Sequence, residues 1–220
     1  RRIASMSEKV QLAMGLDECN HLSSAVIDRG IECLTRFAGR LGDVNNSRLR
    51  VVATNTLRRA VNSQEFIVRA NDILPVHIEI ISGREEARLI YLGVSHTCPS
   101  HQQRFVVDIG GGSTELIIGK NLNPILTEST QMGVAGFTQQ FFGDGNINAL
   151  SFEKAIYVAQ KEIIKYGSHY KKTGFEEAVG SSGTIKTIQQ AIAGFGLGDE
   201  ITLAGVEQLK SSLIACGHID

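Results

Sequence analysis

The sequence predicts an α/β protein, and two observations carry that prediction. Strand-like and helix-like segments alternate through the first 90 residues, as parallel sheets with helical crossovers require. Beyond residue 91, short β-branched runs follow one another with tight turns between them, which is typical of antiparallel hairpins. We therefore expect a first domain over residues 1–90 and a second over residues 91–220.

In the first domain, apolar residues such as Ile27, Ile31 and Leu34 recur at helical spacing and predict a long helix over 22–41. The rest of that domain should comprise a strand over 49–54, a helix over 56–71, a strand over 76–81 and a helix from 84 to about 93.

The second domain begins with a predicted meander of hairpins and continues mainly as helices. Its expected elements are strands over 104–109, 114–118 and 125–130, helices over 133–142 and 151–167, a strand over 177–180, and helices after Ser182 and Thr202. Ser151 is the expected N-cap of the helix over 151–167.

Charge and cysteine content restrict the function. The 22 basic and 23 acidic residues nearly cancel, so an anionic substrate has to be caught by a local pocket and not by a global field. Four scattered cysteines and the lack of a signal peptide or long apolar run predict a cytoplasmic protein, with peripheral membrane association left open. The chain opens with Arg1 and no obvious first strand, so we expect part of a longer polypeptide.

The motif most specific for chemistry is Asp108-Ile-Gly-Gly-Gly-Ser-Thr-Glu115, a glycine-rich loop between two strands. Three consecutive glycines let the backbone take positive φ and direct several N–H groups at one phosphate, and Ser113 and Thr114 add hydroxyl donors. The phosphate-binding candidates are Gly110, Gly111, Gly112, Ser113 and Thr114. The alternative is a tight hairpin with two solvated acids at its ends.

The two flanking acids predict a cation. Carboxylates would repel a phosphate across a few ångströms, so Asp108 and Glu115 are the expected ligands of Mg²⁺. The spacing of the glycines and of Lys186 fits neither a P-loop nor a dinucleotide-binding fingerprint.

Glu86 is the candidate general base. Ser82 and Glu85 fit a capping box at the start of a helix, whereas Glu86 points about 100° away around that helix and is left for another role. Its alternative is an ordinary exposed carboxylate. Arg58, which follows a strand, is a candidate phosphate ligand.

A second loop could also bind a ligand. It joins a strand to a helix and consists of Gly180, Ser181, Ser182, Gly183 and Thr184, whose amides would lie at the start of that helix. An ordinary N-cap turn is an equally good interpretation.

Taken in order, these motifs resemble the exopolyphosphatase and guanosine-pentaphosphate phosphatase family. The matching runs cover nearly the whole chain and are Val51-Val-Ala-Thr-Asn-Thr-Leu-Arg58, Ile80-Ile-Ser-Gly-Arg-Glu-Glu-Ala-Arg-Leu-Ile90, Val107-Asp-Ile-Gly-Gly-Gly-Ser-Thr-Glu-Leu116 and Gly180-Ser-Ser-Gly-Thr-Ile-Lys186. The resemblance implies two actin-like, ribonuclease-H-type domains with mixed sheets flanked by helices. It also implies that both are incomplete in this chain, the first lacking its initial strands and phosphate loop and the second its C-terminal part.

The resemblance also implies roles for individual residues. It places the catalytic glutamate at Glu86, the metal-associated acids at Asp108 and Glu115, and the phosphate-contacting arginine at Arg58. The implied reaction is Mg²⁺-dependent removal of a terminal phosphate, and the motifs look closer to exopolyphosphatases, which act on polyphosphate.

Three alternatives remain open from the sequence. The substrate could be guanosine pentaphosphate, or the protein could be a related ATP-dependent kinase or a non-catalytic sensor of guanosine polyphosphates. The resemblance further suggests a homodimer for the full-length protein and no nucleic-acid partner.

Overall fold

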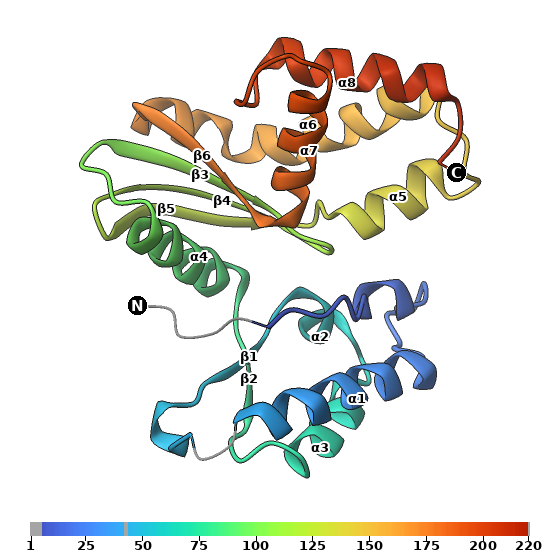
Figure 1. The fold of residues 1–220 in the computed structure, drawn as a ribbon, viewed down its shortest axis with the longest axis vertical. Helices are drawn as coiled ribbons and strands as arrows, with labels where there is room; N and C mark the ends of the chain where they lie inside the picture. Colours follow the sequence, from blue (N-terminus) through green and yellow to red (C-terminus); the bar gives the residue numbers. More distant parts are fainter. Residues whose placement is uncertain (1–5, 42–43, 220) are drawn as a thin grey trace. The chain divides into compact units, whose positions relative to one another are not determined.

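A computed structural model describes residues 6–41 and 44–219 of the chain (Figure 1). The chain divides into two compact units, and the boundary falls between Ser82 and Gly83. The boundary expected after residue 90 differs from this, because it would cut through helix α4 (Gly83–Thr97). That helix belongs to the second unit, since its buried Ala87 and Tyr91 pack against strands of that unit.

The first unit contains a two-stranded parallel sheet in which Val51 pairs with Ile78. Its elements are η1 (Leu12–Gly15), α1 (Ser24–Leu41), η2 (Asn46–Arg48), β1 (Val51–Ala53), α2 (Asn55–Arg59), α3 (Ser63–Asn71) and β2 (Ile78–Ile80). The long helix predicted over 22–41 is confirmed as α1, and its Val26 and Ile27 join Leu57 and Phe66 in the core.

The single helix predicted over 56–71 is wrong, because the structure has two helices, α2 and α3, at that place. The interruption has a tertiary cause. The Asn62 side chain accepts a hydrogen bond from the Leu22 amide at 2.8 Å and donates one to the Leu22 carbonyl at 3.0 Å. These contacts hold the chain between the two helices against the segment that precedes α1.

The second unit is built on a four-stranded sheet in the order β5-β4-β3-β6. Its strands are β3 (Gln103–Ile109), β4 (Thr114–Lys120), β5 (Asn123–Thr130) and β6 (Glu177–Ser181). The first three form the predicted antiparallel meander, and β6 joins β3 in parallel. The helices are α4, α5 (Val134–Phe142), α6 (Ala149–Thr173), α7 (Ser182–Gly194) and α8 (Leu203–Cys216), with α4 on one face of the sheet and α5, α6, α7 and α8 gathered on the other (Figure 1).

Helix α4 is held on its face of the sheet by close packing. Ala87 and Tyr91, 0% and 1% exposed, pack against Val106 and Ile117. Tyr91 also lies against Gly119, where a Cβ atom would collide with its ring, and its hydroxyl donates to the Asn121 carbonyl at 3.1 Å. The position of α4 along the strands is therefore fixed.

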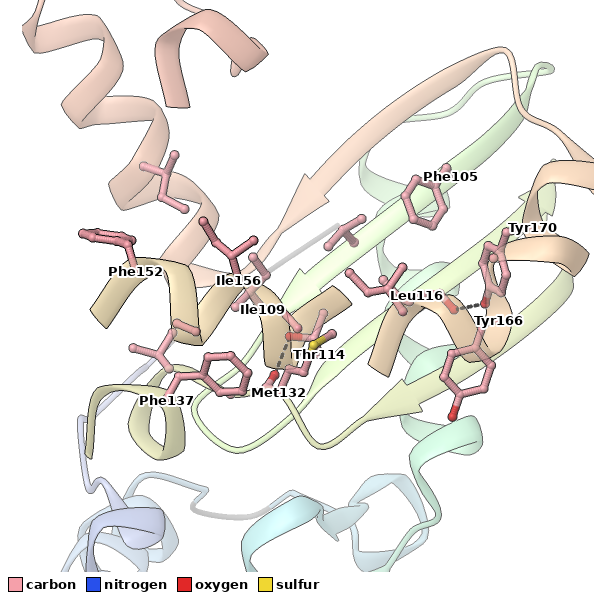
Figure 2. Close-up of a pocket in the computed structure, with 18 of the residues that line it drawn as sticks. Phe105, Ile109, Thr114, Leu116, Met132, Phe137, Phe152, Ile156, Tyr166 and Tyr170 are labelled. Carbon is pink, nitrogen blue, oxygen red and sulfur yellow. Dashed lines mark hydrogen bonds between the residues drawn. The ribbon is translucent and has the colours of Figure 1, made fainter. Parts of the chain in front are cut away.

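On the opposite face, a cavity of about 1020 Å³ lies between the sheet and helices α5 and α6. Its walls are almost entirely apolar, with Phe105 and Leu116 from the strands and Phe137 and Ile156 from the helices (Figure 2). Tyr170 spans the space from α6 to the sheet by donating a hydrogen bond to the Leu116 carbonyl at 2.7 Å.

The expected N-cap of α6 was wrong. Asn148, not Ser151, is the cap, and its side chain accepts a hydrogen bond from the Ser151 amide at 2.9 Å. No helix in the part of the chain that the structure describes is long and apolar enough to cross a membrane.

Candidate active site

Four polar residues form a row across the end of the sheet, one from each strand of the second unit. Asp108 on β3 pairs with Ser181 on β6 and with Glu115 on β4, and Glu115 pairs with Ser129 on β5. Directly paired residues in a sheet project from the same face. The order Ser181–Asp108–Glu115–Ser129 thus puts two adjacent carboxylates between two hydroxyls.

The row lies on the face that α4 covers. Val106 and Ile117, which α4 packs against, are two residues from Asp108 and Glu115 along their strands and so point to the same side. Glu86, in the first turn of α4, is close enough for its negative charge to raise the pKa of Glu115. The structure thereby brings Glu86, Asp108 and Glu115 together within the second unit, whereas the boundary expected after residue 90 placed Glu86 in the first. Their roles in catalysis and metal binding stay predictions.

Glu115 is the most deeply buried member of the row, with 1% of its surface exposed. Burial raises its pKa to about 7, and the negative charges of Glu86 and Asp108 act in the same direction. Hydrogen bonds from the Ser129 and Ser113 hydroxyls oppose that rise, the first of them at 2.7 Å to Oε1. Above this pKa Glu115 is ionised, and the negative charges of Glu86 and Asp108 repel its carboxylate.

Burial likewise raises the pKa of Asp108, and a hydrogen bond with Ser181 partly offsets the rise. Ser181 is the N-cap residue of α7, but its side chain makes no capping hydrogen bond to that helix. Its hydroxyl forms a hydrogen bond with the Asp108 carboxylate instead.

Two further contacts define the surroundings of Glu86. Arg84, also at the start of α4, binds Glu128 of β5 through two nitrogens, at 2.9 and 3.4 Å. Glu85 binds Arg88 through both of its carboxylate oxygens at 2.7 Å. Adjacent acids on α4 thus have different surroundings, with Glu85 paired along the helix and Glu86 beside the carboxylate row.

The glycine-rich loop is fixed by backbone contacts to the start of α5. The Gly110 amide donates to the Ser113 carbonyl at 2.9 Å, and the Gly110 and Gly111 carbonyls accept from the Val134 and Ala135 amides at 3.0 and 2.9 Å. Gly133 lies so close to the backbone of the loop that a Cβ atom there would collide with it. The loop and α5 therefore form one unit.

The predicted reason for the glycines was wrong. Neither Gly110 nor Gly111 takes a φ in the left-handed region. A Cβ on Gly110 would come within 3.1 Å of the Ser113 carbonyl oxygen, which is a tight contact, whereas one on Gly111 would meet no atom within 4 Å. The loop presents bare backbone to open space at Gly111, which suits the close approach of a phosphate.

The expectation that the Thr114 hydroxyl binds phosphate is contradicted. This hydroxyl donates to the Met132 carbonyl at 2.5 Å, and the side chain lines the apolar cavity on the far face of the sheet from Glu115 (Figure 2). Ser113 is also buried, and its hydroxyl bonds Glu115. Both hydroxyls therefore hold the loop in place.

The second predicted loop, from Gly180 to Thr184, leads directly out of the carboxylate row at Ser181. Ser182 has a φ of 89°, a conformation that costs a non-glycine residue of the order of 1 kcal/mol and is common at binding sites. Gly180 has no space for a side chain because Ile185 fills it. The pairing of Asp108 with Ser181 brings this loop to the same end of the sheet as the glycine-rich loop.

Arg58 lies in the first unit, on α2, and its Nη1 donates to the Ile81 carbonyl at 2.6 Å. Its role toward phosphate stays a prediction.

The carboxylate row offers few protein ligands to a cation. In residues 6–41 and 44–219, no group of three or more His, Cys, Asp or Glu side chains is arranged to hold a metal. Mg²⁺ does not need one, since it is commonly bound by one or two carboxylates together with waters and substrate phosphates. Asp108 and Glu115, adjacent and crowded by negative charge, fit that mode of binding.

Ser129 is the site residue that the sequence reasoning missed. Counting back from the turn, where Lys120 pairs with Asn123, places Glu128 opposite Glu115. A β-bulge between Ile118 and Gly119 shifts the register by one residue and puts Ser129 there instead. Gly119 and Pro124, which pair beside the bulge, are residue types found at bulges, but by themselves they do not fix the register of the strands.

Known proteins resemble this chain over most of its length. A model of the Ppx/GppA phosphatase family matches residues 1–220. A Haemophilus influenzae protein named "Putative exopolyphosphatase" is 47% identical over 191 residues, which are 87% of this chain and 59% of that protein. The chain thus spans less than two thirds of that relative's length.

Solved structures agree with the fold. An exopolyphosphatase-like protein, 26% identical, superposes with a TM-score of 0.78 over 84% of this chain and 59% of its own. An Aquifex aeolicus Ppx/GppA enzyme, 24% identical, gives a TM-score of 0.72 over 94% and 70% of the two chains. The predicted actin-like fold, with mixed sheets flanked by helices, is confirmed. With the family model matching throughout, the chain belongs to the Ppx/GppA phosphatase family.

Proposed function

We propose that the natural polypeptide carrying this chain is an exopolyphosphatase, which hydrolyses the terminal phosphoanhydride bond of inorganic polyphosphate with the help of Mg²⁺. The observation that carries the proposal is the crowding of Glu86, Asp108 and Glu115 at one end of the sheet beside a backbone loop. Three buried or half-buried acids repel one another and any phosphate unless a cation joins them. The names of the relatives support the choice of polyphosphate.

Each group of the chain has a distinct task in this proposal. Asp108 and Glu115 would hold Mg²⁺, which would neutralise charge on the phosphate oxygens when bound. Glu86 orients a water and accepts its proton as the water oxygen attacks the terminal phosphorus. The bond from that phosphorus to the bridging oxygen breaks, and the shortened polyphosphate leaves with the electron pair.

The loops serve to bind the substrate. Bare backbone at Gly111 can approach phosphate oxygens closely, and the start of α7 offers amides at the same end of the sheet. Arg58 would add a charge-assisted contact to the substrate. Because the bonds to be broken are alike, the same groups could cleave guanosine pentaphosphate.

The test is phosphate release by the natural polypeptide from polyphosphate and, separately, from guanosine pentaphosphate, each with Mg²⁺ and with EDTA. We expect Mg²⁺-dependent release with the higher kcat/KM on polyphosphate. A higher kcat/KM on guanosine pentaphosphate would make that compound the preferred substrate and would leave the proposed mechanism unchanged. Binding of either compound without any phosphate release would overturn the proposal of an enzyme and favour a sensor. Phosphate transfer from ATP to an acceptor would favour a kinase.

A further inference from the structure

We infer that Ser129 is a positioning residue for the proposed reaction, one that fixes the Glu115 carboxylate in the orientation in which it binds the cation. The inference rests on the proposed function, because it assigns Ser129 to the cation site assumed there. The carrying observation is the hydrogen bond of 2.7 Å from Ser129 Oγ to Glu115 Oε1.

The geometry of this contact is that of a strong hydrogen bond. A donor–acceptor distance of 2.7 Å is the usual length of a well-formed O–H···O hydrogen bond. Ser129 and Glu115 are direct partners on adjacent strands, so the hydroxyl is delivered by the sheet and not by a mobile loop. The bond at Oε1, together with the hydrogen bond from Ser113, restricts rotation of the carboxylate.

The opposite end of the row repeats the arrangement. Asp108 is bonded by Ser181, whose hydroxyl is used for this purpose although it occupies the N-cap position of a helix. Each expected metal ligand therefore has its own serine on the outer side. Carboxylates that bind metals are commonly held by such hydrogen bonds, and loss of one typically lowers metal affinity by about 10- to 100-fold.

The register of β5 against β4 places Ser129, and not another polar residue of that strand, beside Glu115. Thr127, two residues earlier on the same strand and the same face, lies opposite Ile117 and away from the acids. Only the bulge at Ile118/Gly119 brings a serine, and not Glu128, opposite Glu115. A fourth carboxylate at that place, beside those of Glu86, Asp108 and Glu115, would increase the repulsion that the site already contains.

The experiment is a Mn²⁺ titration followed by electron paramagnetic resonance, with Mn²⁺ as the probe, in the presence and absence of methylenediphosphonate. It uses the natural polypeptide and its Ser129→Ala, Ser129→Thr, Thr127→Ala and Glu115→Gln variants. We expect Ser129→Ala to weaken Mn²⁺ binding by about 10- to 100-fold. Ser129→Thr, which keeps the hydroxyl, should restore most of the affinity, and Thr127→Ala should leave it unchanged.

Two results separate this inference from the proposed function. If Glu115→Gln removes Mn²⁺ binding but Ser129→Ala does not weaken it, or if Thr127→Ala weakens it equally, Ser129 is not a positioning residue and the cation site stands. If wild-type protein binds no Mn²⁺ under either condition, or Glu115→Gln binds it normally, the cation site itself is wrong and both proposals fall. A kinetic check is the Mg²⁺ concentration for half-maximal activity, which should rise in Ser129→Ala while KM for polyphosphate changes little.

Discussion

Asp108 and Glu115 face each other directly across strands β3 and β4, with their side chains on the face of the sheet that α4 covers. They lie seven residues apart in sequence. The glycine-rich loop between them reverses the direction of the chain, so that Asp108 on β3 and Glu115 on β4 become direct partners. Both carboxyls have raised pKa values because they are buried. The following predictions depend on that arrangement and on the loop that creates it.

Replacing Glu86 with Gln should lower kcat for polyphosphate by about 10²- to 10⁴-fold, the range usual for loss of a general base, with KM little changed. The matched control is Glu85→Gln, the neighbouring acid, which pairs with Arg88 and should keep kcat within about threefold. Steady-state phosphate release measures both. Phosphate release by Glu86→Gln at the wild-type rate would contradict the proposed role of Glu86 as the general base.

Glu115 should make the stability of the protein depend on pH. Its pKa is about 7 in the folded protein and near 4.5 in the unfolded chain, so the folded state binds more protons between these values. Stability from this group is complete below pH 4.5 and is lost as pH rises through 7, by up to about 3 kcal/mol. Removing the charge with Glu115→Gln should therefore stabilise the protein at pH 8 and not at pH 4.

Urea unfolding at several pH values measures this effect. The exposed Glu153 on α6 provides a control, since Glu153→Gln should show no such pH dependence. Addition of Mg²⁺ should stabilise wild-type protein at pH 8 but not Glu115→Gln. A constant stability difference between wild type and Glu115→Gln across this pH range would contradict the assigned environment.

Replacing Gly133 with Ala should displace the glycine-rich loop, because the new Cβ would collide with the backbone of Gly111 and Gly112. We expect a loss of about 1–3 kcal/mol in stability, as for other overpacked sites, and a loss of activity. The control is Gly136→Ala, inside the helix that Gly133 precedes, where a Cβ meets nothing within 4 Å and should stabilise by up to about 1 kcal/mol. Thermal unfolding and phosphate release distinguish the two variants. Equal stability and activity of Gly133→Ala and Gly136→Ala would contradict the close contact between Gly133 and the loop.

Replacing Thr114 with Val should affect stability and not substrate binding. The change leaves the buried Met132 carbonyl without its hydrogen-bond donor, which costs about 1–3 kcal/mol. KM for polyphosphate should stay within about twofold of wild type, because the hydroxyl lies on the face away from the acids. A large rise in KM with unchanged urea unfolding would restore the role first expected for Thr114.

Much of the fold follows from local sequence. The apolar spacing around Ile27 predicts α1, because burial of one helix face imposes a period that can be read directly. The β-branched runs predict the meander of β3, β4 and β5 by residue type and by the turns between them. The prediction of one helix over 56–71 was wrong because of a tertiary contact. Asn62 is bound to Leu22, 40 residues away, and such a contact leaves no periodic signal.

The candidate site likewise has residues that the sequence predicted and residues that only the tertiary structure placed. By itself, the sequence predicted Glu86, Asp108, Glu115 and the loop of glycines as the candidate site, from acids that flank bare backbone and from an acid that a helix cap does not use. Only the tertiary structure decided that Thr114 points away from the acids, that Ser181 bonds Asp108 and that Ser129 bonds Glu115. Which residue stands opposite another depends on strand register, and a single bulge, which adds one residue to one strand, changes every partner beyond it.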